Sequence, residues 1–296
     1  LDNPAMQSLY DIPAPAKLNL FLHITGRRAD GYHLLQSAFM LVDWCDTLHF
    51  DLRSDGQITR EDLTMPLPAN DLCTRAARAL QQHSGTKLGV HIGIHKSVPA
   101  QAGMGGGSSD AASTLLALNR LWGCNLPLQA LAAIGLSLGA DVPFFLCGSH
   151  AWVEGIGEQL TPLTLPSAQY VVCKPTEGLD TKLIFSDVEL KRDSEPAILY
   201  GFAANEIENK LSELSFGRND LQAVAQRLCP EVGSAIAWLA EQGLSGRMTG
   251  SGSAVFAHLP QGKTWNVATV PDAFQVKLCS SMDAHPLVGW ANSVGQ

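Results

Sequence analysis

Residues 99–112 read PAQAGMGGGSSDAA, with four glycines followed by two serines. Alternating apolar residues over 90–94 predict a strand before this stretch, and an apolar run over 111–118 predicts a helix after it. Glycine lets a backbone approach a ligand closely, and the first turn of a helix presents unpaired N–H groups to an anion. The stretch therefore predicts a phosphate-binding loop between a strand and a helix.

Three other interpretations fit this loop less well. A tight structural turn with Ser108 as the helix cap needs only one or two glycines. A P-loop requires a lysine directly before the serines, where this chain has Gly107. A dinucleotide-binding fingerprint requires glycine or alanine at the position of Ser108, and an acidic residue about 20 positions later. A dehydrogenase is therefore a weak alternative.

Two charged residues lie in apolar surroundings. Residues 16–24 alternate like a strand, which places Lys17 and Asn19 on one face. Asp141 lies in the apolar run 138–145, where a carboxylate is costly unless it is paired. Phosphoryl transfer to an alcohol uses a carboxylate to accept the hydroxyl proton and a lysine to stabilise charge. The alternatives are a solvated lysine on an edge strand and an aspartate that bonds backbone at a helix end.

The remaining pattern alternates strands and helices irregularly, which favours an α+β fold over a regular βαβ array. Apolar alternation predicts strands over residues 47–52, 170–174 and 254–258, with a hairpin turn at 54–56. Helices are predicted over 71–82 behind an N-cap at Asn70, and over 128–138, 219–228 and 233–242. No repeat or long linker divides the chain, so the domain boundary is placed near Leu160.

Composition narrows the class of protein. The 296 residues include 20 Lys+Arg and 28 Asp+Glu, a net charge of −8, which argues against a nucleic-acid binder. The seven cysteines are scattered and form no C-x-x-C pair, so we expect buried thiols in a reducing compartment. The apolar stretch 126–148 is broken by polar residues and proline, and the sequence shows no secretory leader. We therefore expect a cytoplasmic protein without membrane contact.

Three separated motifs resemble the three signatures of the GHMP kinases, which include galactokinase, homoserine kinase and mevalonate kinase. They are PAKLNL at 15–20, the glycine stretch at 99–112, and TGSGS at 249–253. Further segments are similar to the branch of this family that acts on a cytidine-diphosphate-linked polyol. These are 17–22, 28–33, 138–143, 154–158 and, more weakly, 181–185.

The resemblance implies a two-domain α+β fold. Residues 1–160 would form the ATP-binding domain, of the ribosomal protein S5 domain 2-like type. Residues 161–296 would form the substrate-binding domain, of the ferredoxin-like type. The implied reaction is ATP-dependent phosphorylation of a hydroxyl group, with ATP and Mg²⁺ as cofactors.

The resemblance also implies roles for individual residues. Asp141 would be the base, Lys17 its partner, and both would be catalytic. The ATP site would comprise Pro99, Gly103, Met104, Gly105, Gly106, Gly107, Ser108 and Ser109. The substrate site would comprise Asn19, Tyr32, His33, Asp141, Thr181 and Phe185, with Tyr32 and Phe185 stacking on the cytosine and His33 bonding its edge.

Some points depart from the family pattern or stay open. Relatives often carry further glycines where this chain has Gln101 and Ala102. No acidic magnesium ligand stands out, so Ser108 and Ser109 are the candidate ligands, and Asn70 and Lys96 are candidates to flank ATP. Another small-alcohol kinase, such as a mevalonate or homoserine kinase, is the main alternative. A regulatory protein that binds nucleotide without chemistry is the other, and the expected assembly is a monomer or weak homodimer.

Overall fold

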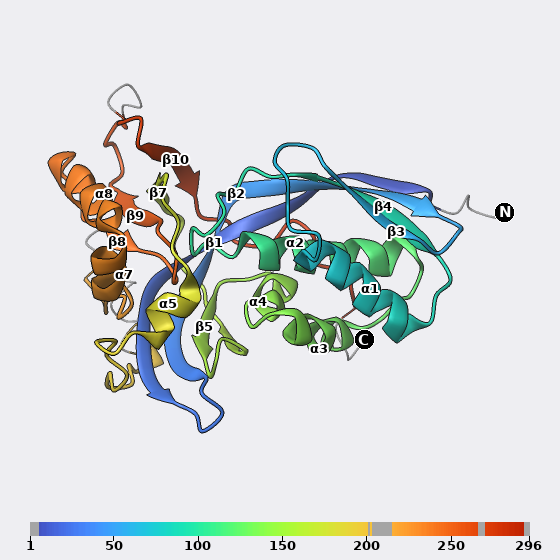
Figure 1. Cartoon of the computed structure of the whole chain (residues 1–296), viewed down its shortest axis with the longest axis horizontal. Helices are drawn as coiled ribbons and strands as arrows, with labels where there is room; N and C mark the ends of the chain where they lie inside the picture. The colour runs from blue at the N-terminus through green and yellow to red at the C-terminus, as the bar shows by residue number, and fades with distance from the viewer. Residues whose placement is uncertain (1–5, 201, 203–214, 266–269, 293–296) are drawn as a thin grey trace.

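The computed structural model describes residues 6–200, 202, 215–265 and 270–292. The first half contains β1 (Ser8–Arg27), β2 (His33–Arg53), β3 (Ile58–Asp62), α1 (Leu72–Ser84), β4 (Gly89–His95), α2 (Gly106–Leu121), α3 (Leu128–Leu138), α4 (Val142–Cys147), β5 (Ala151–Glu154) and β6 (Gln159–Pro162). The second half contains β7 (Gln169–Pro175), α5 (Thr181–Ser186), α7 (Gln222–Leu228), α8 (Pro230–Glu241), β8 (Arg247–Met248), β9 (Val255–Leu259) and β10 (Phe274–Ser280). Figure 1 shows the two halves side by side, joined by the long β1–β2 hairpin.

The long β1–β2 hairpin runs through both halves of the molecule. Its strands have 20 and 21 residues and pair antiparallel from Ser8 with Asp51 to Arg27 with His33. One end packs in the first core with α1 to α4, while Leu22 and Ile24 belong to the core of the second half. Side chains on both faces of the middle of β1 are therefore buried, as in a strand covered on two sides.

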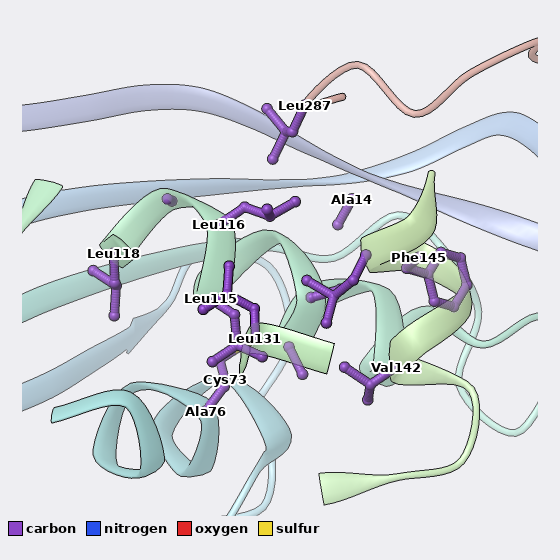
Figure 2. Packing of buried hydrophobic residues seen from close by; sticks show 14 of the residues in the cluster. Ala14, Cys73, Ala76, Leu115, Leu116, Leu118, Leu131, Val142, Phe145 and Leu287 are labelled. Atoms are coloured by element: carbon purple, nitrogen blue, oxygen red, sulfur yellow. The ribbon is translucent and has the colours of Figure 1, made fainter. Parts of the chain in front are cut away.

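The first core lies between the helices α1 to α4 and one face of a six-stranded sheet, whose order is β3-β4-β2-β5-β6 with β1 beside β2. Figure 2 shows α2 at its centre, with Leu115 and Leu116 between the sheet and the neighbouring helices. Leu131 from α3 and Val142 from α4 close the same cluster. This packing fixes the start of α2 and the turn before α4 relative to the strands.

The second half is built on a four-stranded antiparallel sheet of order β10-β7-β9-β8. In chain order this is fourth, first, third and second, the strand order of a ferredoxin-like fold. Helices α7 and α8 pack against it through residues such as Val224 and Leu239. The predicted two-domain α+β fold is confirmed.

The C-terminal segment returns to the first half. The N–H of Met282 donates to the carbonyl oxygen of Leu41 at 3.0 Å, and Leu287 is buried in the first core (Figure 2). Ser281 also forms a bridge with Val42. The division of the chain at residue 160 stays a prediction, and residues 281–292 pack across it.

Several local predictions need correction. Asp71, rather than Asn70, caps α1: its carboxylate accepts from Cys73 N and Thr74 N. The turn at 54–56 joins β2 to β3, but these strands do not pair, because β4 lies between them. The predicted strand at 47–52 is only one end of β2.

The structure tests the expected burial of the thiols and the expected lack of a membrane-spanning segment. All seven cysteines are free, but Cys147 is exposed and Cys45 and Cys124 are only half-buried, so not all of the thiols are buried. Among the described residues, no helix is both long and apolar enough to span a bilayer.

Candidate active site

A cavity of about 670 Å³ lies where β1, β2, α5 and the 249–253 loop meet. It is lined by every residue that the sequence predicts for the catalytic and substrate sites: Lys17, Asn19, Tyr32, His33, Asp141, Thr181 and Phe185. These residues come from four separate segments of the chain. The fold therefore brings them to one cavity, which both the charged pair and the aromatic residues line.

Lys17 is held on β1 by bonds to both glycine-rich loops. Its N–H donates to Met104 O at 2.9 Å, and the N–H of Asn19 donates to the Thr249 hydroxyl at 2.8 Å. The free edge of β1 is thus covered. The Lys17 side chain is only 4% exposed, so the alternative of a solvated edge-strand lysine is wrong.

The Lys17 ammonium faces three partners. Its Nζ lies 3.6 Å from Oδ2 of Asp141, donates to the side-chain oxygen of Asn19, and sits 4.1 Å above the centre of the Phe39 ring. Asn19 in turn donates to the Ser37 hydroxyl at 2.9 Å. Burial lowers the pKa of Lys17 below its ordinary value, and the Asp141 carboxylate opposes that shift. The ammonium is therefore positioned and partly desolvated.

Asp141 stands in the turn between α3 and α4, at the first position before α4. Its side chain makes no capping hydrogen bond to that helix and is 31% exposed to the cavity. The alternative in which Asp141 only closes a helix turn is therefore wrong. A carboxylate that is free of backbone bonds and lies beside a buried ammonium can accept a proton from a bound hydroxyl.

The glycine loop forms the start of α2. Gly105 is the N-cap with φ of 73°, in the left-handed region that favours glycine, and the helix begins at Gly106. Ser108 lies inside the first turn and caps nothing, so the simple capped turn is wrong. The N–H groups of that first turn lack partners within the helix, as an anion site requires.

A second cavity, of about 310 Å³, lies along this loop. Its lining includes Pro99 and all of Gly103 to Gly107, but neither Ser108 nor Ser109. Lys96 lines it as well, while Asn70 does not. Because the sequence predicts a phosphate-binding loop here, we call this space the nucleotide cavity.

The start of α2 lies close to residues of the large cavity. A Cβ on Gly139 would lie 3.7 Å from the Ser108 hydroxyl, and Gly139 is two residues before Asp141. A Cβ on Gly105 would lie 3.3 Å from Cγ of Lys17. The start of α2 is therefore next to the charged pair.

The second glycine loop is packed against the first with no room for side chains. A Cβ on Gly103 would lie 2.2 Å from Thr249 O, and one on Gly252 would lie 2.0 Å from Gly103 N. Gly250 is equally tight, at 2.4 Å from Gly103 O. The 249–253 motif thus supports the phosphate loop and completes the wall of the large cavity.

At the far end of the large cavity, His33 packs on Phe185 with ring centres 5.0 Å apart. Arg192 Nε lies 3.0 Å from His33 Nε2, and a guanidinium can only donate. Burial and the Arg192 charge lower the pKa of His33. The neutral imidazole therefore carries its proton on Nδ1, as a donor. Tyr32 lies at the rim, 60% exposed.

A buried ionic cluster supports the entrance to the phosphate loop. Lys96 Nζ donates to Asp46 and, at 2.5 Å, to Asp110. The other oxygen of Asp46 accepts from Ser97 N and Val98 N at 2.6 and 2.8 Å. Burial raises the pKa of Asp110 to about 7, although the Lys96 charge opposes that shift. The cluster fixes the backbone that leads into the loop.

Sequence reasoning missed several residues of this site. None of Phe39, Ser37 and Arg192 belongs to a motif: Phe39 lines the cavity, while Ser37 and Arg192 form hydrogen bonds with the lining residues Asn19 and His33. Ser251, which donates to or accepts from the Thr181 hydroxyl at 2.8 Å, lay in a recognised glycine motif without an assigned role.

Comparisons with known proteins agree with this geometry. A family model described as the GHMP kinases N terminal domain matches residues 71–149, and another, GHMP kinases C terminal, matches residues 199–262. The predicted GHMP kinase fold is thus confirmed by both family models.

Individual relatives place the chain in a narrower group within the GHMP kinases. A protein of Albidiferax ferrireducens named 4-diphosphocytidyl-2-C-methyl-D-erythritol kinase is 69% identical over 288 residues, which cover 97% of each chain. A crystal structure of 4-(cytidine 5'-diphospho)-2C-methyl-D-erythritol kinase has a TM-score of 0.76 and 32% identity, and covers 93% of this chain and 98% of its own. The chain belongs to the 4-diphosphocytidyl-2-C-methyl-D-erythritol kinases, a family of ATP-using GHMP kinases.

A more distant structure, L. major mevalonate kinase in complex with R-mevalonate, has a TM-score of 0.70 at 14% identity. It covers 96% of this chain and 99% of its own. That likeness concerns the fold alone, so it does not favour a mevalonate kinase.

Proposed function

We propose that this kinase transfers the γ-phosphoryl group of ATP to the 2-hydroxyl of 4-diphosphocytidyl-2-C-methyl-D-erythritol. The observation that carries the proposal is one cavity of about 670 Å³ with two chemically different ends. Lys17 and Asp141 lie at one end, beside the phosphate loop. His33 and Phe185 form the other, where a pyrimidine ring would lie.

Asp141 is the proposed base. Its free carboxylate accepts the proton of the substrate hydroxyl as the oxygen attacks the γ-phosphorus. The Lys17 ammonium, 3.6 Å from Oδ2 of Asp141, stabilises the negative charge that develops on the reacting oxygens. Its hydrogen bond to Asn19 orients it. Preorganised charge in a dry cavity stabilises the transition state more strongly than the same charge in water.

The phosphates of ATP are proposed to lie on residues 103–109. The backbone N–H groups at the start of α2 donate to phosphate oxygens, and the positive end of the helix adds to the attraction. Gly103 and Gly105 supply the left-handed turns that expose these groups, with φ of 76° and 73°. The Ser108 hydroxyl, which lies near Gly139 and so on the side of Asp141, is proposed to bind the γ-phosphate.

Magnesium is proposed to accompany the nucleotide, since a kinase of this type uses it to neutralise phosphate charge. The described residues contain no cluster of three carboxylate, histidine or cysteine groups that would hold a metal alone. The Ser109 hydroxyl is buried without a hydrogen-bond partner, and Ser108 is the neighbouring hydroxyl. Mg²⁺ commonly binds with few protein ligands and several waters, so this donor set suits it.

The cytosine is proposed to lie between Tyr32 and Phe185. The Nδ1–H of neutral His33 donates to an acceptor on the pyrimidine edge, because Arg192 occupies Nε2. Thr181, held by Ser251, is available to the polar part of the substrate. Substrates without a base would leave this end of the cavity unfilled.

The proposal is tested by steady-state release of ADP with ATP, Mg²⁺ and one acceptor at a time. The acceptors are the cytidyl polyol, mevalonate and homoserine. Turnover confined to the cytidyl polyol, with competitive inhibition by CDP, is expected. Turnover with mevalonate or homoserine instead would establish the alternative kinase, and ATP binding without turnover would favour a regulatory role. Sedimentation of the purified chain tests the proposed monomer or weak dimer, and fractionation tests its proposed cytoplasmic location.

A further inference from the structure

Gln101, at the entrance of the phosphate loop, has an unusual backbone conformation. Its φ is +54°, and it is one of three non-glycine residues with positive φ among those described. A residue with a side chain is strained in this region, where glycine is not. Gln101 lines the nucleotide cavity and is exposed, so no core packing compensates the strain.

The Gln101 amide instead lies against a loop of the other half of the molecule. A Cβ placed on Gly178 would be 1.9 Å from Gln101 Oε1 and 3.0 Å from its Cδ. The amide therefore rests directly on the backbone of Gly178, where only glycine leaves room for it. Gly178 has no left-handed conformation, and the three atoms nearest to an added Cβ all belong to the Gln101 side chain.

A second connection runs parallel to the first. The N–H of Ser253 donates to Gln101 O at 3.2 Å, and the Ser253 hydroxyl donates to Glu177 O at 2.8 Å. The same carbonyl accepts from the buried Lys174 ammonium at 2.9 Å. Residues 176–180 are thus tied to the phosphate loop and to β7.

These residues lead directly into α5. Asp180 caps that helix by accepting from Lys182 N at 2.8 Å. The helix carries Thr181 and Phe185, which line the substrate cavity. A shift of Gln101 would therefore pass through Gly178 and Asp180 to the aromatic end of that cavity.

We propose that Gln101 is a positioning residue that couples the phosphate loop to α5 through its contact with Gly178, so that nucleotide and the cytidine part of the substrate bind cooperatively. The choice of ligands rests on the proposed function. Coupling requires that each ligand favours the same arrangement of the connecting element, and it acts equally in both directions. Because Gln101 lies in the nucleotide cavity and Gly178 precedes α5, one contact serves both sites.

The experiment measures the affinity of the full chain for CDP by calorimetry, with and without saturating ADP and Mg²⁺. In the unmodified chain we expect ADP to tighten CDP binding about fivefold or more, in the usual range of coupling. Gln101→Ala keeps the positive φ and a Cβ but removes the amide, and should reduce this factor to about one. The affinity for CDP alone should stay unchanged, which a general structural defect would not allow.

Gly178→Ala provides an independent test. Its Cβ would lie 1.9 Å from Gln101 Oε1 and 3.2 Å from Gln101 Cβ, so we expect the flexible amide to be displaced and the chain to remain folded. This variant and the double variant should lose the coupling to the same extent as Gln101→Ala, because one contact is broken in all three. Gln261→Ala, on an exposed loop, is the matched control and should keep the coupling.

The outcomes separate the two proposals. Normal CDP affinity with undiminished coupling in Gln101→Ala, or additive losses in the double variant, would overturn the role of Gln101. Absence of any coupling in the unmodified chain would also overturn it. Failure of CDP to bind at all would contradict the proposed function, on which this inference rests.

Discussion

The Nζ atom of Lys17 lies 3.6 Å from Oδ2 of Asp141, although one residue belongs to the first strand and the other to the turn before α4. The N–H of Lys17 donates to Met104 O in the glycine loop. Asp141 follows two residues after Gly139, which lies next to Ser108 of the same loop. The pair is therefore placed by the same elements that form the proposed phosphate site. A movement of the glycine loop would therefore also move Lys17 and Asp141.

Replacing Asp141 by asparagine should lower kcat by about 10²–10⁴, the usual contribution of a general base. The side chain keeps its size, and the nucleotide cavity does not include it, so the Kd for ADP should change less than twofold. Rapid-quench kinetics and calorimetry measure the two quantities. Asp55→Asn, in an exposed turn, is the control, and near-normal turnover of the Asp141 variant would remove this residue from the mechanism.

The pH profile of kcat should reveal Lys17. Burial lowers the pKa of Lys17, so its charge is lost as pH rises through a value below about 10.4, the ordinary pKa of lysine. Turnover should therefore fall on the alkaline side before that pH is reached. Lys17→Arg, which does not titrate in this range, should be slower but should lack this alkaline decrease. An unchanged alkaline limb in that variant would assign the titration to another group.

The glycine loop between a strand and a helix was predictable because its residues are neighbours in sequence, and the pair of Lys17 and Asp141 because each belongs to a distinctive motif. The long hairpin was only partly predicted. Residues 34–42 of β2 are nearly continuous in apolar character because both faces are buried, and such a run lacks the alternation that identifies a strand. Asn70 and Asp71 are both good caps, and only the tertiary ion pair of Asp71 with Arg60 selects between them.

Adding one methyl group at Gly103 should reveal how tightly the glycine loop packs against the 249–253 loop. Gly103→Ala adds a Cβ 2.2 Å from Thr249 O at a φ of +76°, so we expect the KM for ATP to rise at least tenfold. Gly262→Ala is the matched control, with a φ of +81° and no atom within 4 Å. It should lose about 1 kcal/mol of stability through backbone strain and keep its KM. Equal KM values in the two variants would show that crowding does not matter.

Phe185 should contribute to affinity for the base. Removing one stacking ring costs about 1–3 kcal/mol, so Phe185→Ala should raise the KM for the cytidyl substrate by about 5- to 150-fold. The KM for ATP should stay within twofold, because Phe185 does not line the nucleotide cavity. Phe185→Tyr keeps the aromatic face and should restore most of the loss. A rise in both KM values would point to collapse of α5 instead of lost stacking.

Arg192 shows what the sequence could not reveal. It lies far from His33 along the chain and in no motif, yet its hydrogen bond fixes which nitrogen of the imidazole carries the proton. The position arises because the segment after α5 folds back toward the start of β2. Only the tertiary structure supplies that information.

Asp110 should make folding stability depend on pH. Its pKa is raised from about 3.8 to about 7 by burial, so the folded state retains a proton that the unfolded chain releases. The contribution of Asp110 to stability is therefore fully present below about pH 4 and is lost as pH rises toward 7, at up to about 1.4 kcal/mol per pH unit. Urea unfolding at pH 5 and pH 8 should show a smaller difference for Asp110→Asn. Glu241→Gln is the exposed control, and an unchanged difference in the Asp110 variant would contradict the assignment.

The most direct test of the central claim is a competition in one tube. The cytidyl polyol, mevalonate and homoserine are mixed at equal concentration with limiting ATP and Mg²⁺, and each product is measured by mass spectrometry. We expect a single product, the cytidyl polyol with one added phosphate, located at the 2-hydroxyl by phosphorus–carbon coupling to C2 and its attached carbons in NMR. Phosphorylation of mevalonate or homoserine in preference, or of a different hydroxyl of the cytidyl polyol, would contradict the account.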